Sequence, residues 1–176
     1  MFSSKAQLVT RTPQNGTDRE NYLSLLVDEF INSSSLDAKS QVLANLANFA
    51  YDPVNYDYIR NVGVLDIFVH VIKKETEPKL LHFACAGISN LCIDPLNIEY
   101  LLTNEALPPL VALLKCELND IVADVITILI YLKSCGKDIQ LNTPEIDERM
   151  QSLKQSTNNM IVNLATIFLE DTNNTK

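Results

Sequence analysis

Apolar residues recur along this chain at intervals of three and four, as they do on one face of an α-helix. The stretch 38–51 shows the pattern most plainly, with Val42, Leu43, Leu46 and Phe49 at helical spacing. The same spacing recurs over 19–30, 64–73, 80–92, 120–132, 146–155 and 160–169. The pattern predicts an all-α chain.

One polar phrase interrupts the apolar pattern twice. Residues 45–59 read NLANFAYDPVNYDYI, and residues 90–101 read NLCIDPLNIEYL. The Asp-Pro pair begins at Asp52 in the first copy and at Asp94 in the second, an offset of 42 residues. Pro disfavours the helical conformation in the residue before it, so each pair ends a helix, and the Asp side chain can accept from the N–H groups of the next helix.

Three helices per unit with a period near 42 are typical of armadillo and HEAT repeats. One such unit cannot bury its apolar face alone, so neighbouring units stack. The sequence predicts a short right-handed α-solenoid as one domain over 19–171. Its expected parts are a flexible tail at 1–18, a capping helix at 19–32, repeats at about 37–76, 77–118 and 119–157, a C-terminal helix at 158–171 and a tail at 172–176. The apolar helix at 19–32 fits either a cap or a partner-docking face.

Composition narrows the classes of function. The chain has 176 residues, of which 47% are hydrophobic, and a formal net charge of −8. An acidic surface repels phosphate, so direct binding to DNA or broad binding to nucleic acid is not expected. The four cysteines form no CxxC pair and lie among apolar residues, which favours free thiols in a reducing compartment over a metal site. Neither a signal peptide nor a membrane-spanning segment is expected, so the chain reads as cytosolic or nuclear.

Catalytic motifs are absent from the sequence. There is no GxGxxG, Walker loop, HExxH or GxSxG. The only histidines, His70 and His82, have no Cys or Ser partner at a suggestive spacing and read as ordinary surface or junction residues. We therefore predict no enzymatic activity, no cofactor and no metal.

Several segments resemble armadillo repeats in particular. GVLDIFVHVI at 63–72 and ALPPLVALL at 106–114 resemble the second armadillo helix, and VLANLANFA at 42–50 and FACAGISNLC at 83–92 resemble the third. The stretches DAKSQVLANLANFAYDPVNYDYIRNVGVLDIF and NLATIFLED are also similar to one small family, armadillo repeat-containing protein 7.

This resemblance implies a nuclear, non-enzymatic subunit of the minor spliceosome in pre-mRNA splicing. It implies a protein partner with an RNA-recognition motif, an indirect association with a small nuclear ribonucleoprotein, and no membrane. The chain departs from the family in two places. It has no basic extension after the last helix, which puts direct RNA contact in doubt, and Asn104-Glu105-Ala106 replaces the usual Gly of the second repeat.

The third helices of armadillo repeats line the concave face, and the resemblance places Asn48 and Asn90 there, with Asn45 nearly a turn before Asn48. An Asn amide can donate to and accept from the backbone of an extended ligand. The alternative is that these amides tie one repeat to the next, and the sequence leaves both interpretations open. In the next unit the equivalent position falls at Tyr131. The chain has no Trp, which argues against the nuclear-import mode of peptide binding.

The tyrosines of the repeated phrase divide into two groups. Tyr58 and Tyr100 recur at the offset of 42 and are expected to pack at repeat junctions. Tyr51 and Tyr56 break the pattern, so we expect them at an interface. The concave-face candidates for partner binding are Asn45, Asn48, Tyr51, Tyr56, Asn90 and Tyr131. A general peptide-binding scaffold or carrier in cytoplasmic signalling or transport is the alternative function.

Overall fold

The structure is a computed structural model that describes residues 2–11, 17–135, 141 and 143–170. Every regular element within those ranges is helical, as the apolar spacing predicted. Contacts divide the chain into two compact units, residues 1–91 (unit 1) and 92–176 (unit 2), where the sequence suggested one domain. The division falls inside the second predicted repeat.

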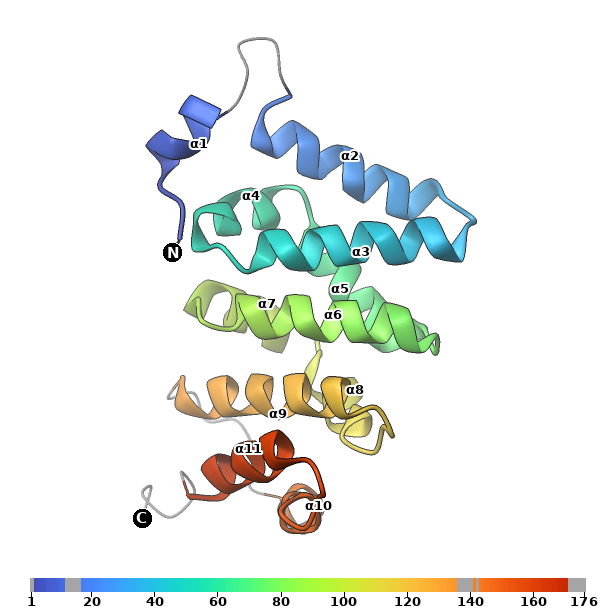
Figure 1. The fold of residues 1–176 in the computed structure, drawn as a ribbon, viewed down its shortest axis with the longest axis vertical. Coiled ribbons are helices and arrows are strands. Elements are labelled where there is room, and N and C mark those ends of the chain that lie inside the picture. The colour runs from blue at the N-terminus through green and yellow to red at the C-terminus, as the bar shows by residue number, and fades with distance from the viewer. Residues whose placement is uncertain (1, 12–16, 136–140, 142, 171–176) are drawn as a thin grey trace. The chain divides into compact units, whose positions relative to one another are not determined.

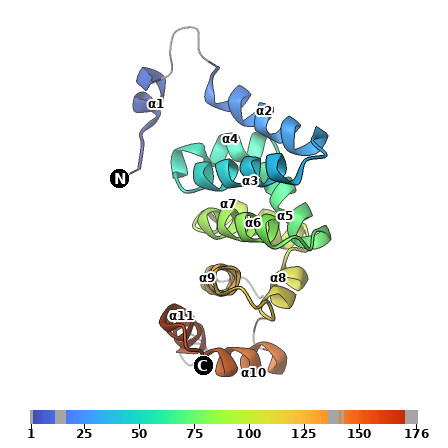
Figure 2. The same ribbon diagram turned by 45° about the vertical axis from the view of Figure 1, so that its right-hand side comes forward.

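Unit 1 packs its helices in pairs around a shared apolar core. α3 contacts α2 and α6, and α5 contacts α6 (Figure 1; Figure 2 gives a second view). Leu43, Leu46, Phe68 and Ile88 are fully buried within it. The helices of unit 1 are α1 (Lys5–Arg11), α2 (Arg19–Asn32), α3 (Leu36–Ala50), the 3₁₀ turn η1 (Pro53–Asn55), α4 (Tyr56–Asn61), α5 (Val64–Lys74) and α6 (Pro78–Leu91).

Unit 2 is held together by the same kind of helix pairing. Its helices are α7 (Pro95–Thr103), α8 (Leu107–Leu113), α9 (Asn119–Ser134), α10 (Pro144–Leu153) and α11 (Asn159–Glu170), and α9 packs against both α8 and α11. Two cations tie helix ends. Lys133 donates from Nζ to the Phe168 carbonyl at 2.8 Å, and Arg149 donates from Nε and Nη2 to the Leu114 carbonyl at 2.9 and 2.8 Å. These bonds satisfy carbonyls that a helix C-terminus leaves without an intrahelical partner.

The repeated Asp-Pro phrase builds the same hinge in both units. Asp52 accepts from the Val54 N–H at 3.3 Å, and Asp94 accepts from the Leu96 N–H at 2.8 Å. In unit 1 the buried Asn55 adds a second bond, from its Nδ2 to the Phe49 carbonyl at 2.8 Å. Each copy of the phrase therefore starts a new helix, and the first copy also closes the end of α3.

Gly63 and Glu105 occupy the same position of the repeat and share an unusual backbone. Gly63 has a φ of 79° and Glu105 a φ of 50°, both in the left-handed region. The family pattern expects Gly here, since a side chain costs energy in this conformation. The second repeat keeps the turn without the Gly.

Gly87 permits a close approach of α6 to α5. A Cβ built on Gly87 would lie 2.4 Å from Cζ of the fully buried Phe68 ring. No side chain fits in that space unless the ring moves.

Residues 2–11 differ from the loose tail expected over 1–18. They contain α1, and a reciprocal capping box starts it. Gln7 N–H donates to Ser4 Oγ at 3.2 Å, and Ser4 N–H donates to Gln7 Oε1 at 2.8 Å. This arrangement satisfies two backbone donors that a helix start would otherwise leave open. The rest of the expected tail at 12–16, and the tail at 172–176, lie outside the described residues.

Candidate functional site

Asn90 and Tyr56 connect helices within unit 1. The Asn90 side chain donates from Nδ2 to the Ala47 carbonyl of α3 at 3.2 Å. The Tyr56 hydroxyl donates to the backbone carbonyl of Asn90 at 2.8 Å. The sequence suggested that Tyr56 is an interface residue, but it is only 5% exposed. It is buried because its hydroxyl points toward α6, the third helix of the next repeat. Both residues hold α6 against the first repeat.

Three other predicted residues remain accessible near the end of α3. Asn48 is exposed, Asn45 is half-buried one turn earlier, and the Tyr51 side chain is 61% exposed just beyond the helix. α3 positions Asn48 outward because Leu46 and Ala47 on its other faces are buried in the core. The amide and phenol groups of Asn48 and Tyr51 can therefore reach a ligand.

An aromatic and cationic cluster adjoins these residues. The Phe49 ring meets Tyr22 of α2 edge-on, with ring centroids 5.7 Å apart, and Arg19 Cζ lies 4.8 Å from the Phe49 centroid. Helical spacing places Phe49 among the apolar residues of α3, yet the structure leaves it half-buried, and Tyr22 is exposed. Partly exposed rings next to a cation are typical of protein-binding surfaces.

Asp52 and Asp57 give the neighbouring surface its charge. Burial alone would raise the pKa of Asp52, but hydrogen bonds from Ser3 and Val54 and the charge of Arg19 hold it below its ordinary value. The pKa of Asp57 is also lowered, first by the hydrogen bond from Lys5 and then by that from Arg60. Arg60 Nη2 lies 2.6 Å from Asp57 Oδ1 and Lys5 Nζ lies 3.3 Å from Asp57 Oδ2. Both carboxylates stay ionised at neutral pH.

Tyr131, the remaining predicted residue, lies half-buried on α9 in unit 2. Among the described residues of that unit, the exposed large hydrophobic residues are elsewhere, at Ile93, Leu96, Leu118, Met160 and Ile167. Its assignment to partner binding stays a prediction.

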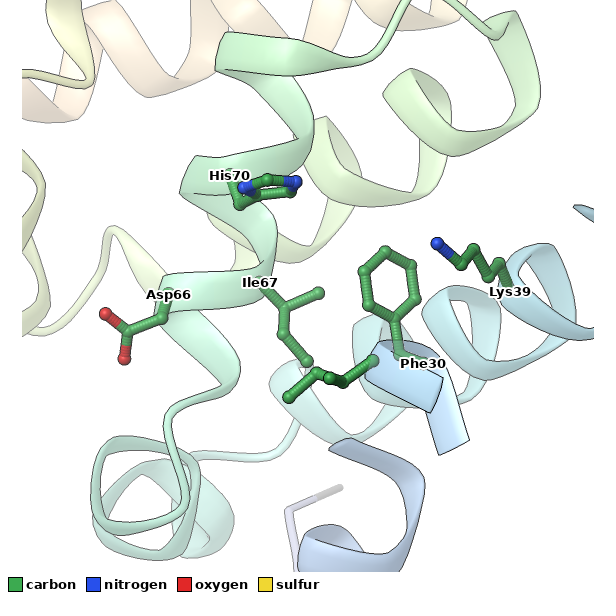
Figure 3. A pocket seen from close by; sticks show the side chains of 6 residues that line it. Phe30, Lys39, Asp66, Ile67 and His70 are labelled. Carbon is green, nitrogen blue, oxygen red and sulfur yellow. The ribbon is translucent and has the colours of Figure 1, made fainter. Parts of the chain in front are cut away.

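A separate pocket of about 310 Å³ opens between α2, α3 and α5, lined by Phe30, Ile31, Lys39, Asp66, Ile67 and His70. Figure 3 shows Phe30 and Ile67 facing one another, with Lys39 and His70 beside them and Asp66 pointing away. Lys39 Nζ lies 5.1 Å from the Phe30 centroid. No local sequence pattern predicts this pocket, because its residues come from three helices.

The described residues contain no group of three His, Cys, Asp or Glu side chains that could hold a metal ion. All four cysteines are free, and burial, with a smaller contribution from Cys135, raises the pKa of Cys92 far above its ordinary value. A buried thiol of this kind is inert at neutral pH. Within the described part of the chain, no helix is both long and apolar enough to cross a membrane.

Comparison with designed repeat proteins identifies the fold. Computationally designed armadillo repeat proteins for modular peptide recognition match with a TM-score of 0.75 and 20% identity, over 85% of this chain and 63% of theirs. A designed armadillo repeat protein in complex with the peptide (KR)4 matches with a TM-score of 0.69 and 18% identity, over 85% of this chain and 63% of that one. The chain thus spans less than two thirds of these designed proteins, and its fold is that of armadillo repeats.

Comparison of sequences identifies the family. No family model matches the chain. It is 43% identical over 155 residues to Armadillo repeat-containing protein 7 of Mus musculus, across 87% of this chain and 78% of the mouse protein. With identity at this level over most of both proteins, and with the armadillo-repeat fold, the chain belongs to the armadillo repeat-containing protein 7 family.

Proposed function

We propose that this protein is a non-catalytic adaptor that binds a protein partner through the exposed end of α3. We further propose that it acts in the nucleus as a subunit of the minor spliceosome, with a partner that contains an RNA-recognition motif. The observation that carries the binding function is the exposure of Asn48 and Tyr51 beside the partly exposed Phe49 and Tyr22 rings. The splicing role rests on the family resemblance.

The chemistry of this surface suits a peptide or protein better than a small substrate. Asn48 offers one donor group and one acceptor, which match the backbone of an extended segment. Tyr51 and Tyr22 add large apolar area with polar tips. Among the described residues around them, none forms a general acid–base pair or a nucleophile with an adjacent base, so this surface supports binding rather than catalysis.

The negative charge of this chain favours a partner whose bound segment is positively charged. The chain carries a net charge of −8, and Asp52 directly follows Tyr51 in the sequence, with Asp57 in the α4 helix beyond it. The peptide in the designed armadillo complex, (KR)4, alternates lysine and arginine. Complementary charge accelerates association with such a partner and disfavours bare phosphate. We therefore propose that any RNA in the complex is held by the partner.

Affinity purification from the protein's own cells tests this function, with bound proteins and RNAs both identified. A tagged wild-type chain is compared with the Asn48→Ala/Tyr51→Ala variant. The matched control is Asn163→Ala/Met160→Ala, which removes an exposed Asn and an exposed large side chain from α11 of unit 2. We expect a stoichiometric protein with an RNA-recognition motif and a small nuclear RNA of the minor spliceosome, both depleted by the α3 variant alone.

Two outcomes would contradict parts of this proposal. Recovery of cytoplasmic signalling or transport proteins without small nuclear RNA would replace the splicing role with that of a general peptide-binding scaffold. Equal recovery of partners by all three proteins would remove the end of α3 from the binding surface.

A further inference from the structure

The segment Phe2–Lys5 lies against the surface formed by Tyr51, Asp52 and Asp57, which we call the Tyr51–Asp57 surface. The Phe2 and Tyr51 ring centroids are 5.6 Å apart. Ser3 N–H donates to Asp52 Oδ2 at 2.9 Å, and Lys5 Nζ lies 3.3 Å from Asp57 Oδ2. An apolar, a backbone and an ionic contact thus hold one short segment from far away in the sequence.

Local structure explains why the Ser3 N–H points outward. The capping box of Ser4 and Gln7 uses the backbone N–H groups of those two residues, so Ser3 precedes the helix and its N–H remains for another acceptor. Asp52 is suited to accept it, because one carboxylate oxygen, Oδ1, already accepts from Val54 N–H and the other, Oδ2, faces the segment. Asp52 therefore caps the start of the next helix and also binds the backbone N–H of Ser3.

These contacts are accessible to solvent and so are exchangeable. Phe2 and Tyr51 are 54% and 61% exposed as whole residues, and the side chains of Lys5 and Asp57 are 69% and 59% exposed. Exposed ion pairs and partly covered rings hold a segment only weakly. A segment of another protein with the same groups can compete for the same surface.

We propose that the Tyr51–Asp57 surface is a docking site for a partner segment that presents a large apolar side chain, the N–H of the next residue and a basic side chain two residues further on. Residues 2–5 of this chain occupy the site as an internal ligand until the partner segment displaces them. The proposal rests on the protein-binding function proposed above and specifies the chemistry of the segment that is bound. It extends the binding surface from Asn48 to Asp57.

The recurrence of the residue types supports a site that belongs to the repeat. The equivalents of Tyr51, Asp52 and Asp57 at the offset of 42 are Ile93, Asp94 and Glu99, again an apolar residue, an Asp and a second acid. Neither acid is required for the core, since Asp57 and Glu99 are both exposed. The pairing of an apolar with an acidic residue around the Asp-Pro hinge is thus a feature of the repeat.

The test uses the full chain and a synthetic peptide of residues 2–11, FSSKAQLVTR, carrying a fluorophore at its C-terminus. Fluorescence anisotropy measures its binding to the wild type and to the Phe2→Ala/Lys5→Ala variant, whose own segment is weakened. We expect the variant to bind the peptide about tenfold more tightly, because residues 2–5 then occupy the site in a smaller fraction of the molecules and leave it open to the peptide. Lys79→Ala, an exposed lysine on α6, controls for lost charge and is expected to match the wild type.

A charge reversal in the variant background identifies the site. Adding Asp57→Lys is expected to weaken peptide binding about tenfold or more, since it replaces attraction to the peptide lysine with repulsion. Glu117→Lys makes the same charge change at an exposed position of unit 2 and is expected to leave binding unchanged. Far-ultraviolet circular dichroism of each variant confirms that the helices persist.

Three results would overturn the proposal. One is equal peptide affinity in the wild type and the Phe2→Ala/Lys5→Ala variant, and another is equal affinity with and without Asp57→Lys. A third is a concentration-dependent dimer of the wild type in sedimentation, lost in the Phe2→Ala/Lys5→Ala variant, which would assign the surface to a second copy of the chain. Because the probe is the chain's own sequence, these results are independent of whether the purification recovers a splicing partner.

Discussion

Asn48 and Asn90 occupy the same position in consecutive copies of the repeat and do different things. The Asn90 amide donates to the Ala47 carbonyl of α3, whereas Asn48 is exposed near the end of that helix. The two copies differ in their neighbours. Asn90 lies on α6, which packs against α3 of the preceding repeat, whereas Asn48 lies on α3, which is preceded only by α1 and α2. Repeat position therefore fixes where a side chain starts, and the preceding repeat decides whether that side chain ties the fold together or faces a partner.

Gly87 offers the strongest test of how the second copy packs. Gly87→Ala places a methyl group into the Phe68 ring, so we expect a loss of about 1–3 kcal/mol in the free energy of unfolding. The equivalent residue in the first copy is the half-buried Asn45. Asn45→Ala is expected to change the free energy of unfolding by less than about 0.5 kcal/mol. Urea denaturation of both variants measures the difference. Equal losses would show that the two copies pack alike.

Substitutions at the left-handed turn shared by Gly63 and Glu105 are expected to have opposite effects on stability in the two copies. Glu105→Gly removes a side chain from the left-handed region, so we expect it to stabilise the fold by about 0.5–1 kcal/mol. Gly63→Ala introduces that strain into the first copy and is expected to destabilise by about 1 kcal/mol. Thermal and urea denaturation provide the values. A destabilised Glu105→Gly variant would mean that the Glu105 side chain contributes more than its backbone costs.

The asparagine pair tests the comparison directly. Asn90→Ala removes the bond to the Ala47 carbonyl and is expected to cost about 1 kcal/mol of unfolding free energy. Asn48→Ala removes an exposed amide and is expected to cost less than about 0.5 kcal/mol. The same urea series measures both. Should Asn48→Ala prove as costly as Asn90→Ala, the first copy would also be a structural tie.

Acid sensitivity at Asp52 is the smallest expected effect. A carboxyl whose pKa is lower in the folded chain stabilises the fold above its unfolded pKa, and this stabilisation disappears as the pH falls through the folded pKa. The ordinary value is 3.8, so the wild type should lose this contribution as the pH drops below it, and Asp52→Asn should lack that part of the pH dependence. Urea midpoints at about pH 7 and about pH 3 measure it.

Asp28→Asn, at an exposed position of α2, controls for the loss of one charge in that experiment. An Asp52→Asn variant with the same pH dependence as the wild type and this control would contradict the role of the Ser3 and Val54 hydrogen bonds.

Most of the fold could be predicted because its signals are local. Helical spacing identified α2, α3, α5, α6, α9, α10 and α11, and the Asp-Pro phrase identified the hinge and its cap in both units. α1 was missed although its signal is present, because Ser4 and Gln7 have the spacing of a capping box inside a stretch whose Pro13 and Gly16 suggested a loose tail.

The candidate site could be predicted only in part. Sequence patterns left the role of Asn90 open, since its partner is a backbone carbonyl on another helix and any residue at position 47 supplies one. Tyr56 breaks the repeat pattern, which suggested an interface. Its hydroxyl instead donates to the backbone carbonyl of Asn90 within unit 1. The docking of Ser3 on Asp52 joins residues 49 positions apart, and no local pattern reports such a contact.

Hydrogen exchange of the full chain, measured by mass spectrometry with and without its purified partner, shows directly whether a partner binds the end of α3 and displaces residues 2–5. We expect the partner to protect backbone amides over about 45–60, at the end of α3 and the start of α4, and to increase exchange in residues 2–5 as that segment is displaced. Protection confined to α10 and α11, with residues 2–5 unchanged, would contradict this expectation.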